Sequence, residues 1–270
     1  MPIKQHPVRL FLLRRLELRR FGFQPLLALA GLLVAGMTLA EPPASAQDLR
    51  PFVARYQVKF YGLTGGVLQL TLRRGDAPNE YVYESHADPS FLGGFFISSS
   101  ARESCVLRVV DGQIHPLHFV SDDGKSGDEK DSNIVYDWEH DKLQGRSERV
   151  DFDQPLPPRI QDHLSIQIAV ILALQRGTEL GQYSLIDAGE IKQFTYRRDG
   201  AGVVVYQGRV LDATVVSSQR TTDPLDQPGA RITRYWHVPE LGNLPARAER
   251  SRDGKIDLKM ELLDVQFPTN

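Results

Sequence analysis

The sequence predicts a mostly β protein: a strongly curved antiparallel sheet, half-barrel or sandwich, of about a dozen strands, with one buried helix near residues 160–176. Three observations support this fold class. Apolar and polar residues alternate along many segments, which is typical of strands with one face on a core. Turn signals separate these segments at short intervals. A single segment is apolar on nearly every side, as a buried helix is, and strands do not alternate with helices as in a parallel sheet.

The first 46 residues have the organisation of a cleavable signal peptide. Six basic residues are followed by an uncharged apolar run from Pro25 to Ala40, and Ala44-Ser45-Ala46 offers the small side chains that a signal peptidase requires. The run of 16 residues is shorter than the ~20 residues of a membrane-spanning helix. We expect cleavage after Ala46, export to the periplasm, and no permanent membrane anchor after cleavage.

The remaining residues 47–270 are expected to form a single β-rich domain with a sizeable core. Without the six basic and two acidic residues of the leader, the chain keeps 26 basic and 32 acidic residues, a formal net charge of −6. A mildly acidic protein with no basic block is a poor nucleic-acid binder. Cys105 is the single cysteine, so no internal disulfide forms, and a buried structural thiol is expected.

Strand alternation is clearest at the two ends of this domain. Phe52–Phe60 and Leu68–Leu72 alternate near its start, and Ile256–Leu262 alternates near its end. Between the alternating segments, turns are expected at residues 62–66, 75–79, 111–112, 199–200 and 253–254, which are rich in Gly, Asp, Asn and Pro.

The helix is expected to follow Pro157-Pro158, which end the preceding strand. From Ile166 to Leu174 only Gln167 is polar, so the helix must be surrounded by protein. Asp162 lies near the expected start and Gly177 at a plausible end. A fully buried strand is the alternative interpretation, and the length of the segment favours the helix. The economical arrangement is one helix held in the concave face of the sheet.

No motif identifies a reaction, a metal or a cofactor. The acidic loop at residues 122–129 lacks the spacing of a calcium or phosphate loop and is typical of a solvated hairpin tip. His115 and His118 would lie on opposite faces of a strand. Asp162, His163 and Ser165 do not share one helix face, so no catalytic triad is expected there. We therefore predict no catalytic residue and no metal site.

One segment between strands is unusually apolar. It contains Phe91, Leu92, Phe95 and Phe96 around two glycines. Such a loop is either packed into the core or exposed to an apolar partner. These four residues are candidate ligand-binding residues.

Several motifs resemble a bacterial family of exported proteins catalogued as domain of unknown function 3108. They are Tyr56-x-Val58 followed by Gly62-Leu63 and Gly65-Gly66, Gln161-Asp162-x-Leu164-Ser165, Tyr196-Arg197-Arg198, and Trp236-x-x-Pro239-Glu240-Leu241-Gly242-Asn243-Leu244-Pro245-x-Arg247. The resemblance spans roughly residues 52–267. It departs from the family at Leu211–Thr214, where a Gly-x-Phe-like segment is common.

The resemblance implies an exported envelope protein with no established activity, so no catalytic residue is carried over. Gln161, Asp162, Ser165, Pro239 and Pro245 are expected to be structural motif residues. Trp236 is expected to face the core, and Arg247 to pair with Glu240 or Asp162 inside the curve. Trp236 and Arg247 are also candidate ligand-binding residues.

These observations favour a non-catalytic periplasmic binding or chaperone-like module for an apolar ligand. The expected partners are a lipid, a lipidated protein or an envelope protein. An envelope hydrolase acting from a cleft near the helix, through Asp162, His163 or Glu240, is one alternative. A structural envelope-assembly protein is the other, and it predicts an exposed apolar patch without a pocket.

Overall fold

The computed structural model describes residues 49–89, 101–125, 127, 130–187, 189–222 and 230–268. Residues 43–270 form one compact unit. The expected signal peptide, and Phe91, Leu92, Phe95 and Phe96, lie outside the described residues. No helix of the described part of the chain is long and apolar enough to cross a membrane.

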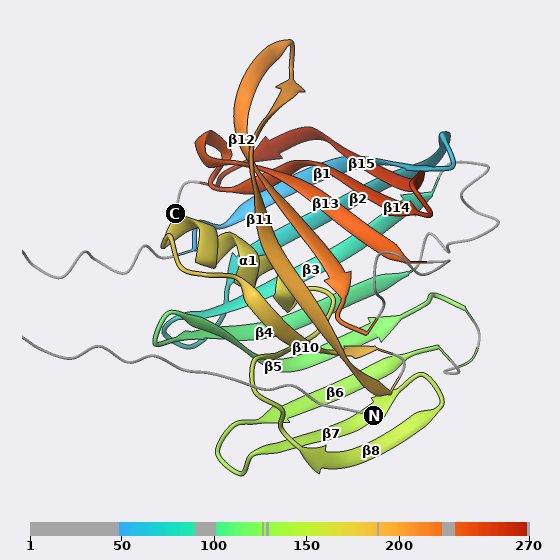
Figure 1. Ribbon diagram of the computed structural model, residues 1–270. Helices are drawn as coiled ribbons and strands as arrows, with labels where there is room; N and C mark the ends of the chain where they lie inside the picture. The colour runs from blue at the N-terminus through green and yellow to red at the C-terminus, as the bar shows by residue number, and fades with distance from the viewer. Residues whose placement is uncertain are drawn as a thin grey trace, which may run out of the picture. The chain divides into compact units, whose positions relative to one another are not determined.

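The described residues form fifteen strands, one α-helix and a short 3-10 helix, arranged as in Figure 1. In chain order these are β1 (Phe52–Phe60), β2 (Leu63–Arg74), β3 (Glu80–Pro89), β4 (Arg102–Val110), β5 (Gln113–Asp122), β6 (Ser132–Asp137), β7 (Lys142–Ser147), β8 (Val150–Pro155), β9 (Ile160–Gln161), α1 (Ser165–Gln175), β10 (Gly181–Asp187), β11 (Glu190–Tyr206), β12 (Arg209–Arg220), β13 (Arg231–Val238), η2 (Pro239–Leu241), β14 (Leu244–Arg252) and β15 (Lys255–Gln266).

All fifteen strands belong to one curved, open sheet, so the predicted fold class is confirmed. Its order is β8-β7-β6-β5-β4-β3-β2-β1-β15-β14-β13-β12-β11-β10-β9, so the first and last strands meet in the middle. Neighbouring strands are antiparallel except β9 and β10, which are parallel. The count exceeds the predicted dozen partly because β9 has only two residues, Ile160 and Gln161, and is too short for an alternation to appear.

Tight hairpins connect many neighbouring strands. At Asp111-Gly112 and Asp253-Gly254, both central residues have positive φ, as type I′ turns require. Asp199-Gly200 was expected to be a third such turn, but this expectation is wrong. Gly200 instead lies at a register shift inside β11, and the chain turns only at Gln207-Gly208. An Asp-Gly pair is also compatible with a bulge, and only strand pairing distinguishes the two.

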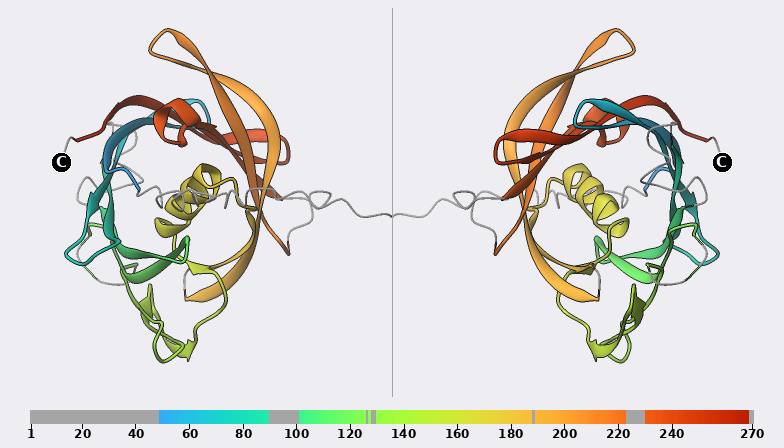
Figure 2. Two further views of the ribbon diagram at one scale, coloured as in Figure 1. Left: turned by 90° about the vertical axis from the view of Figure 1, so that its left-hand side faces the viewer. Right: turned by 90° about the vertical axis from the view of Figure 1, so that its right-hand side faces the viewer.

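The sheet curls around α1, which lies inside the curve (Figure 2). Eight of the helix residues are buried, and the seven apolar ones among them form one hydrophobic core with the concave strand faces. The edge strand β9 is joined to β5 by a hydrogen bond that the Gln161 side-chain amide donates to the Ile114 carbonyl at 2.9 Å. The sheet is therefore barrel-like, although β8 and β9 do not pair with each other.

The helix lies where the sequence predicts it, but it starts later. Ile160 and Gln161 pair with β10 as a short strand, so the helical segment begins at Ser165. The Asp162 carboxylate accepts hydrogen bonds from the backbone N–H groups of Leu164 and Ser165, at 2.9 and 2.8 Å. This arrangement satisfies N–H groups that the first helical turn leaves without partners.

Candidate functional site

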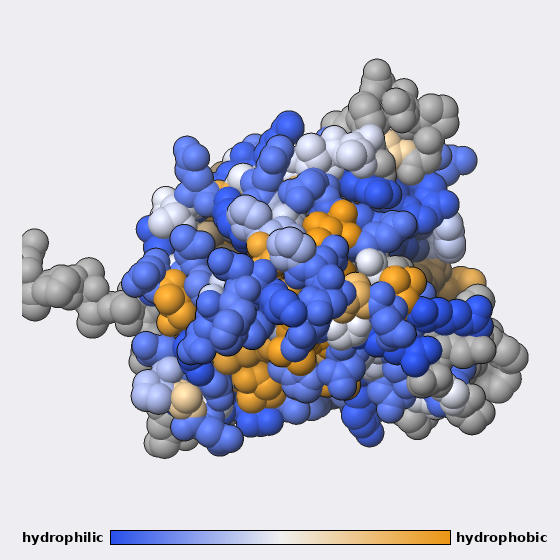
Figure 3. Space-filling model, turned by 90° about the horizontal axis from the view of Figure 1, so that it is seen from below, coloured by the Kyte–Doolittle hydropathy of each residue, from blue (hydrophilic) through white to orange (hydrophobic). Residues whose placement is uncertain are grey.

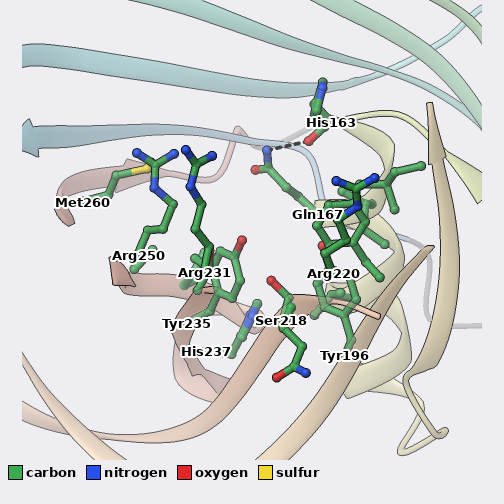
Figure 4. Close-up of a pocket in the computed structure, with 18 of the residues that line it drawn as sticks. His163, Gln167, Tyr196, Ser218, Arg220, Arg231, Tyr235, His237, Arg250 and Met260 are labelled. Carbon is green, nitrogen blue, oxygen red and sulfur yellow. Dashed lines mark hydrogen bonds between the residues drawn. The ribbon is translucent and has the colours of Figure 1, made fainter. Parts of the chain in front are cut away.

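A cavity of about 830 Å³ lies between α1 and the concave face of the sheet (Figure 4). Its walls come from β1, β2, the segment 163–170, and β10 to β15. The lining residues are Tyr56, Leu68, Leu70, His163, Ile166, Gln167, Val170, Leu185, Lys192, Phe194, Tyr196, Ser218, Gln219, Arg220, Arg231, Thr233, Tyr235, His237, Pro245, Ala248, Arg250, Arg252 and Met260.

The strand pleat points these side chains inward. On β13, every second residue from Arg231 to His237 lines the cavity. Thr233 lies opposite Ser218 on one side and opposite Arg250 on the other, and these two residues also line the cavity. The lining is therefore a continuous patch across several strands.

The lining combines cationic and aliphatic side chains. Five lining side chains are cationic: Lys192, Arg220, Arg231, Arg250 and Arg252. None of the described residues that line the cavity is Asp or Glu. Aliphatic surface comes from α1 and from strands on both sides of it: Leu68, Leu70, Ile166, Val170, Leu185 and Met260.

Figure 4 shows Arg220, Arg231 and Arg250 extending in one direction, away from Tyr196 and His237. Arg231 is exposed, whereas His237 is 3% exposed. The cationic groups therefore mark the solvent-facing end of the cavity, and the histidine lies in its depth.

Among the described residues, four buried polar atoms of the lining have no hydrogen-bond partner. They are the Tyr56 hydroxyl, Nε2 of His237, and the Nε atoms of Arg220 and Arg252. Burial lowers the pKa of His237 to about 4, so the ring is neutral near pH 7. Its Nδ1 lies 2.8 Å from the Asn243 carbonyl, which only accepts, so Nδ1 carries the proton and Nε2 is a free acceptor. Unpartnered buried polar atoms are costly, and a ligand or water in the cavity can satisfy them.

The three residues of the hydrolase alternative do not form one site. Asp162 is fully buried, and besides its two helix contacts its carboxylate lies 3.1 Å from Cys105 Sγ and 3.4 Å from the Tyr136 hydroxyl. Burial and the Asp162 charge raise the pKa of the Cys105 thiol and of the Tyr136 hydroxyl. His163 is exposed and lines the cavity. Glu240 lies on η2, where it pairs with Arg209 at 2.9 Å.

Trp236 and Arg247 contact each other and do not line the cavity. They are directly opposite on β13 and β14, and the guanidinium lies 3.8 Å from the indole ring centre. Arg247 pairs with Glu249 at 3.1 Å, so its expected pairing with Glu240 or Asp162 is wrong. The physical reason is strand alternation: residues two apart on β14 project from the same side, which places Glu249 beside Arg247. A role of Trp236 and Arg247 in ligand binding stays a prediction.

The structural motif residues are distributed around the helix. Gln161 joins β9 to β5, and Ser165 Oγ accepts a hydrogen bond from the Asp162 backbone N–H at 2.9 Å. Pro245 lines the cavity. Pro239 lines a second, more open cavity of about 610 Å³ near the end of α1.

The acidic loop places the carboxylates of Asp122, Asp123 and Asp131 within 4.8 Å of one another. Each accepts a hydrogen bond from a backbone N–H of the same loop. These bonds explain the clustering through the turn itself.

The cationic residues of the cavity were not predicted. Arg220 and Arg231 flank the polar loop at residues 221–230, and Arg250 and Arg252 precede the Asp253-Gly254 turn. A recognisable signal existed: basic residues at the ends of consecutive antiparallel strands meet at the same sheet end.

Curved sheet, enclosed helix and internal cavity define a barrel-like β protein with a ligand-sized pocket. The family described as protein of unknown function DUF3108 matches residues 55–262, and the chain belongs to this family. The resemblance to domain of unknown function 3108 that the sequence motifs indicated is thereby confirmed.

The fold is similar to the crystal structure of a beta-barrel-like protein of domain of unknown function DUF1849 from Brucella abortus. The TM-score is 0.52 at 12% sequence identity, over 82% of this chain and 99% of that chain. A stretch of 141 residues, 50% of this chain, is 24% identical to hydroxyproline O-galactosyltransferase GALT6 of Arabidopsis thaliana. The matched stretch spans 20% of that enzyme.

Proposed function

We propose that this protein is a non-catalytic binding module that takes the apolar chain of a ligand into the cavity beside α1. The observation that carries the proposal is a cavity of about 830 Å³ in the concave face of the sheet, with aliphatic walls and unpartnered buried polar atoms. This volume is within the range of small-molecule sites, which are mostly apolar with a few placed polar groups.

The hydrogen bonds made by the Asp162 carboxylate favour a binding function over hydrolysis. Its two carboxylate oxygens are directed to four donors: two backbone N–H groups, a thiol and a phenol. A general base needs a carboxylate oxygen within reach of a substrate proton. Asp162 therefore supports the helix start and is not available as a base.

The face seen in Figure 3 weighs against an assembly role for that side. Its hydrophobic residues occur in small groups separated by hydrophilic ones. The apolar surface of a stable protein interface is larger and more continuous than these separate groups.

We further propose that the protein works in the periplasm after cleavage behind Ala46. The basic, apolar and small-residue segments of residues 1–46 support this location. Expressing the full chain in a Gram-negative host and measuring the intact mass of the osmotic-shock fraction tests it. We expect a mature chain beginning at Gln47. Recovery of uncleaved protein in the cytoplasm would contradict the proposal.

A fluorescence titration tests the binding role. A fluorescent fatty acid is titrated into the purified protein and into two variants, Ala248→Trp and Val205→Trp. Ala248 lines the cavity, whereas Val205 is 75% exposed on the β11–β12 hairpin. We expect the indole in the cavity to weaken binding about tenfold or more, since it occupies ligand volume, and the hairpin variant to bind as the parent does. Equal affinities of the two variants, or no binding by the parent, would refute the proposal.

A further inference from the structure

Three arginines that form no ion pair with the described residues mark the solvent-facing end of the cavity. We call them the arginine rim: Arg220, Arg231 and Arg252. Arg220 ends β12, Arg231 begins β13 and Arg252 ends β14. Because these strands are consecutive and antiparallel, the three residues meet at one end of the sheet. Arg231 and Arg252 are directly opposite each other.

Like charges on opposing strand positions destabilise a sheet unless another group compensates them. Among the described residues, no carboxylate pairs with any member of the rim. The adjacent Arg250 differs, since its Nε lies 2.8 Å from the buried Asp257 carboxylate. Lys192 lies 3.8 Å from Glu190. The rim is therefore a concentration of positive charge in a protein whose net charge is negative.

Burial adds a second, independent observation. The Nε atoms of Arg220 and Arg252 are inaccessible to solvent and have no hydrogen-bond acceptor among the described residues. A guanidinium N–H without an acceptor costs free energy, because it has lost water without a replacement. An anion with two or more oxygens is the group that satisfies such donors, and guanidinium groups bind carboxylate and phosphate in a paired geometry.

The rim and the aliphatic walls belong to the same cavity, so one ligand can contact both. We propose that the ligand is an anionic amphiphile, whose carboxylate or phosphate headgroup is held by Arg220, Arg231 and Arg252 while its apolar chain lies against α1. This inference rests on the proposed binding function and specifies its ligand class. The chain enters toward Tyr56 and His237, and the headgroup stays at the solvent-facing end.

Three probes with the same acyl chain length test the headgroup: a long-chain fatty acid, the corresponding alcohol, and the corresponding lysophosphatidate. Each is titrated into the parent protein by calorimetry at low and at physiological salt. We expect both anionic probes to bind about tenfold or more tightly than the alcohol, since a hydrogen bond between a guanidinium and an anion is stronger than one to a neutral hydroxyl. Their preference over the alcohol should shrink with salt. The tighter of the two anionic probes identifies the headgroup as carboxylate or phosphate.

A matched pair of double variants tests whether the preference for anionic probes depends on the arginine rim. Arg231→Gln with Arg252→Gln removes two rim charges. Arg55→Gln with Arg73→Gln removes two charges from exposed ion pairs elsewhere in the sheet. We expect the rim variant to lose its preference for the anionic probes and to bind the alcohol as before, and the control to match the parent. The single Arg231→Gln change, at an exposed position, should show the same trend with no effect on folding.

The outcomes are separable. If none of the probes binds the parent, the proposed binding function fails. If the alcohol binds the parent as tightly as the two anionic probes, or if the rim variant weakens all probes equally, the headgroup inference fails while binding stands.

Discussion

Asp162 illustrates how a buried charged residue is tolerated when every oxygen has donors. Its carboxylate accepts from Leu164, Ser165, Cys105 and Tyr136, and so links the start of α1 to β4 and β6. The sequence indicated that Asp162 lies near the helix start. It did not indicate that Cys105 and Tyr136, on distant strands, contact its carboxylate.

Replacing Asp162 with Ala should lower the free energy of unfolding by about 3 kcal/mol, because it removes a helix cap and leaves buried donors without an acceptor. Asp162→Asn keeps one carbonyl oxygen for the two N–H groups and should cost less. Urea denaturation measures both. Asp151→Ala, at an exposed position of β8, is the control and should change the unfolding free energy little. An alanine variant as stable as the control would contradict the capping role.

His237 makes stability depend on pH in a defined direction. Its folded pKa of about 4 lies below the ordinary 6.5, so between these values the unfolded chain binds more protons. The free energy of unfolding should therefore fall as pH drops from 6.5 to about 4, by about 3 kcal/mol in total. Unfolding in urea at a series of pH values measures this.

The contribution of His237 is the difference between the parent and His237→Gln, whose amide can still donate to Asn243. This comparison is needed because burial raises the pKa of Glu103, which gives stability that is lost as pH rises. A His237→Gln variant with the parental slope would contradict the assignment.

At the scale of elements, β6 and β7 approach closely at a glycine. Gly145 has φ of +141°, and a Cβ there would lie 2.1 Å from the Asn133 carbonyl oxygen. Gly208, in the β11–β12 turn, also has positive φ but has open space around it. Comparing substitutions at the two glycines therefore distinguishes the cost of the backbone conformation from the cost of the steric contact.

Gly145→Ala should destabilise the protein by about 3 kcal/mol or more, because backbone must move to relieve the clash. Gly208→Ala should cost only about 1 kcal/mol, the penalty of a left-handed conformation. Thermal and urea unfolding compare them. Similar losses in the two variants would show that conformation alone, and not the contact with β6, requires glycine at position 145.

At the scale of the domain, the edge strand β9 is held against β5 by a side chain. Gln161 is 2% exposed and donates to the Ile114 carbonyl, across a gap that strand pairing does not close. Gln161→Ala should lower the free energy of unfolding by about 1–2 kcal/mol. It should also speed amide hydrogen exchange in β9 before the sheet unfolds globally. Gln144→Ala, at an exposed position of β7, should do neither, and unchanged exchange in β9 would refute this role.

The fold class, many of the strands and the buried helix could be predicted because their signals are local. Alternation along Phe52–Phe60 and the apolar segment Ile166–Leu174 depend only on which side chains must leave water. Asp199-Gly200 was misassigned because one dipeptide suits both a turn and a bulge. Strand register, not the local sequence, decides between them.

By itself the sequence determined a mostly β chain of one family, with a helix that must be enclosed. Only the tertiary structure decided that Arg220, Arg231 and Arg252 share one end of a cavity whose depth holds Tyr56 and His237. The reason is physical. Burial is dictated residue by residue through hydrophobicity, whereas the meeting of residues far apart in sequence depends on pairing register and on how the sheet curves around α1.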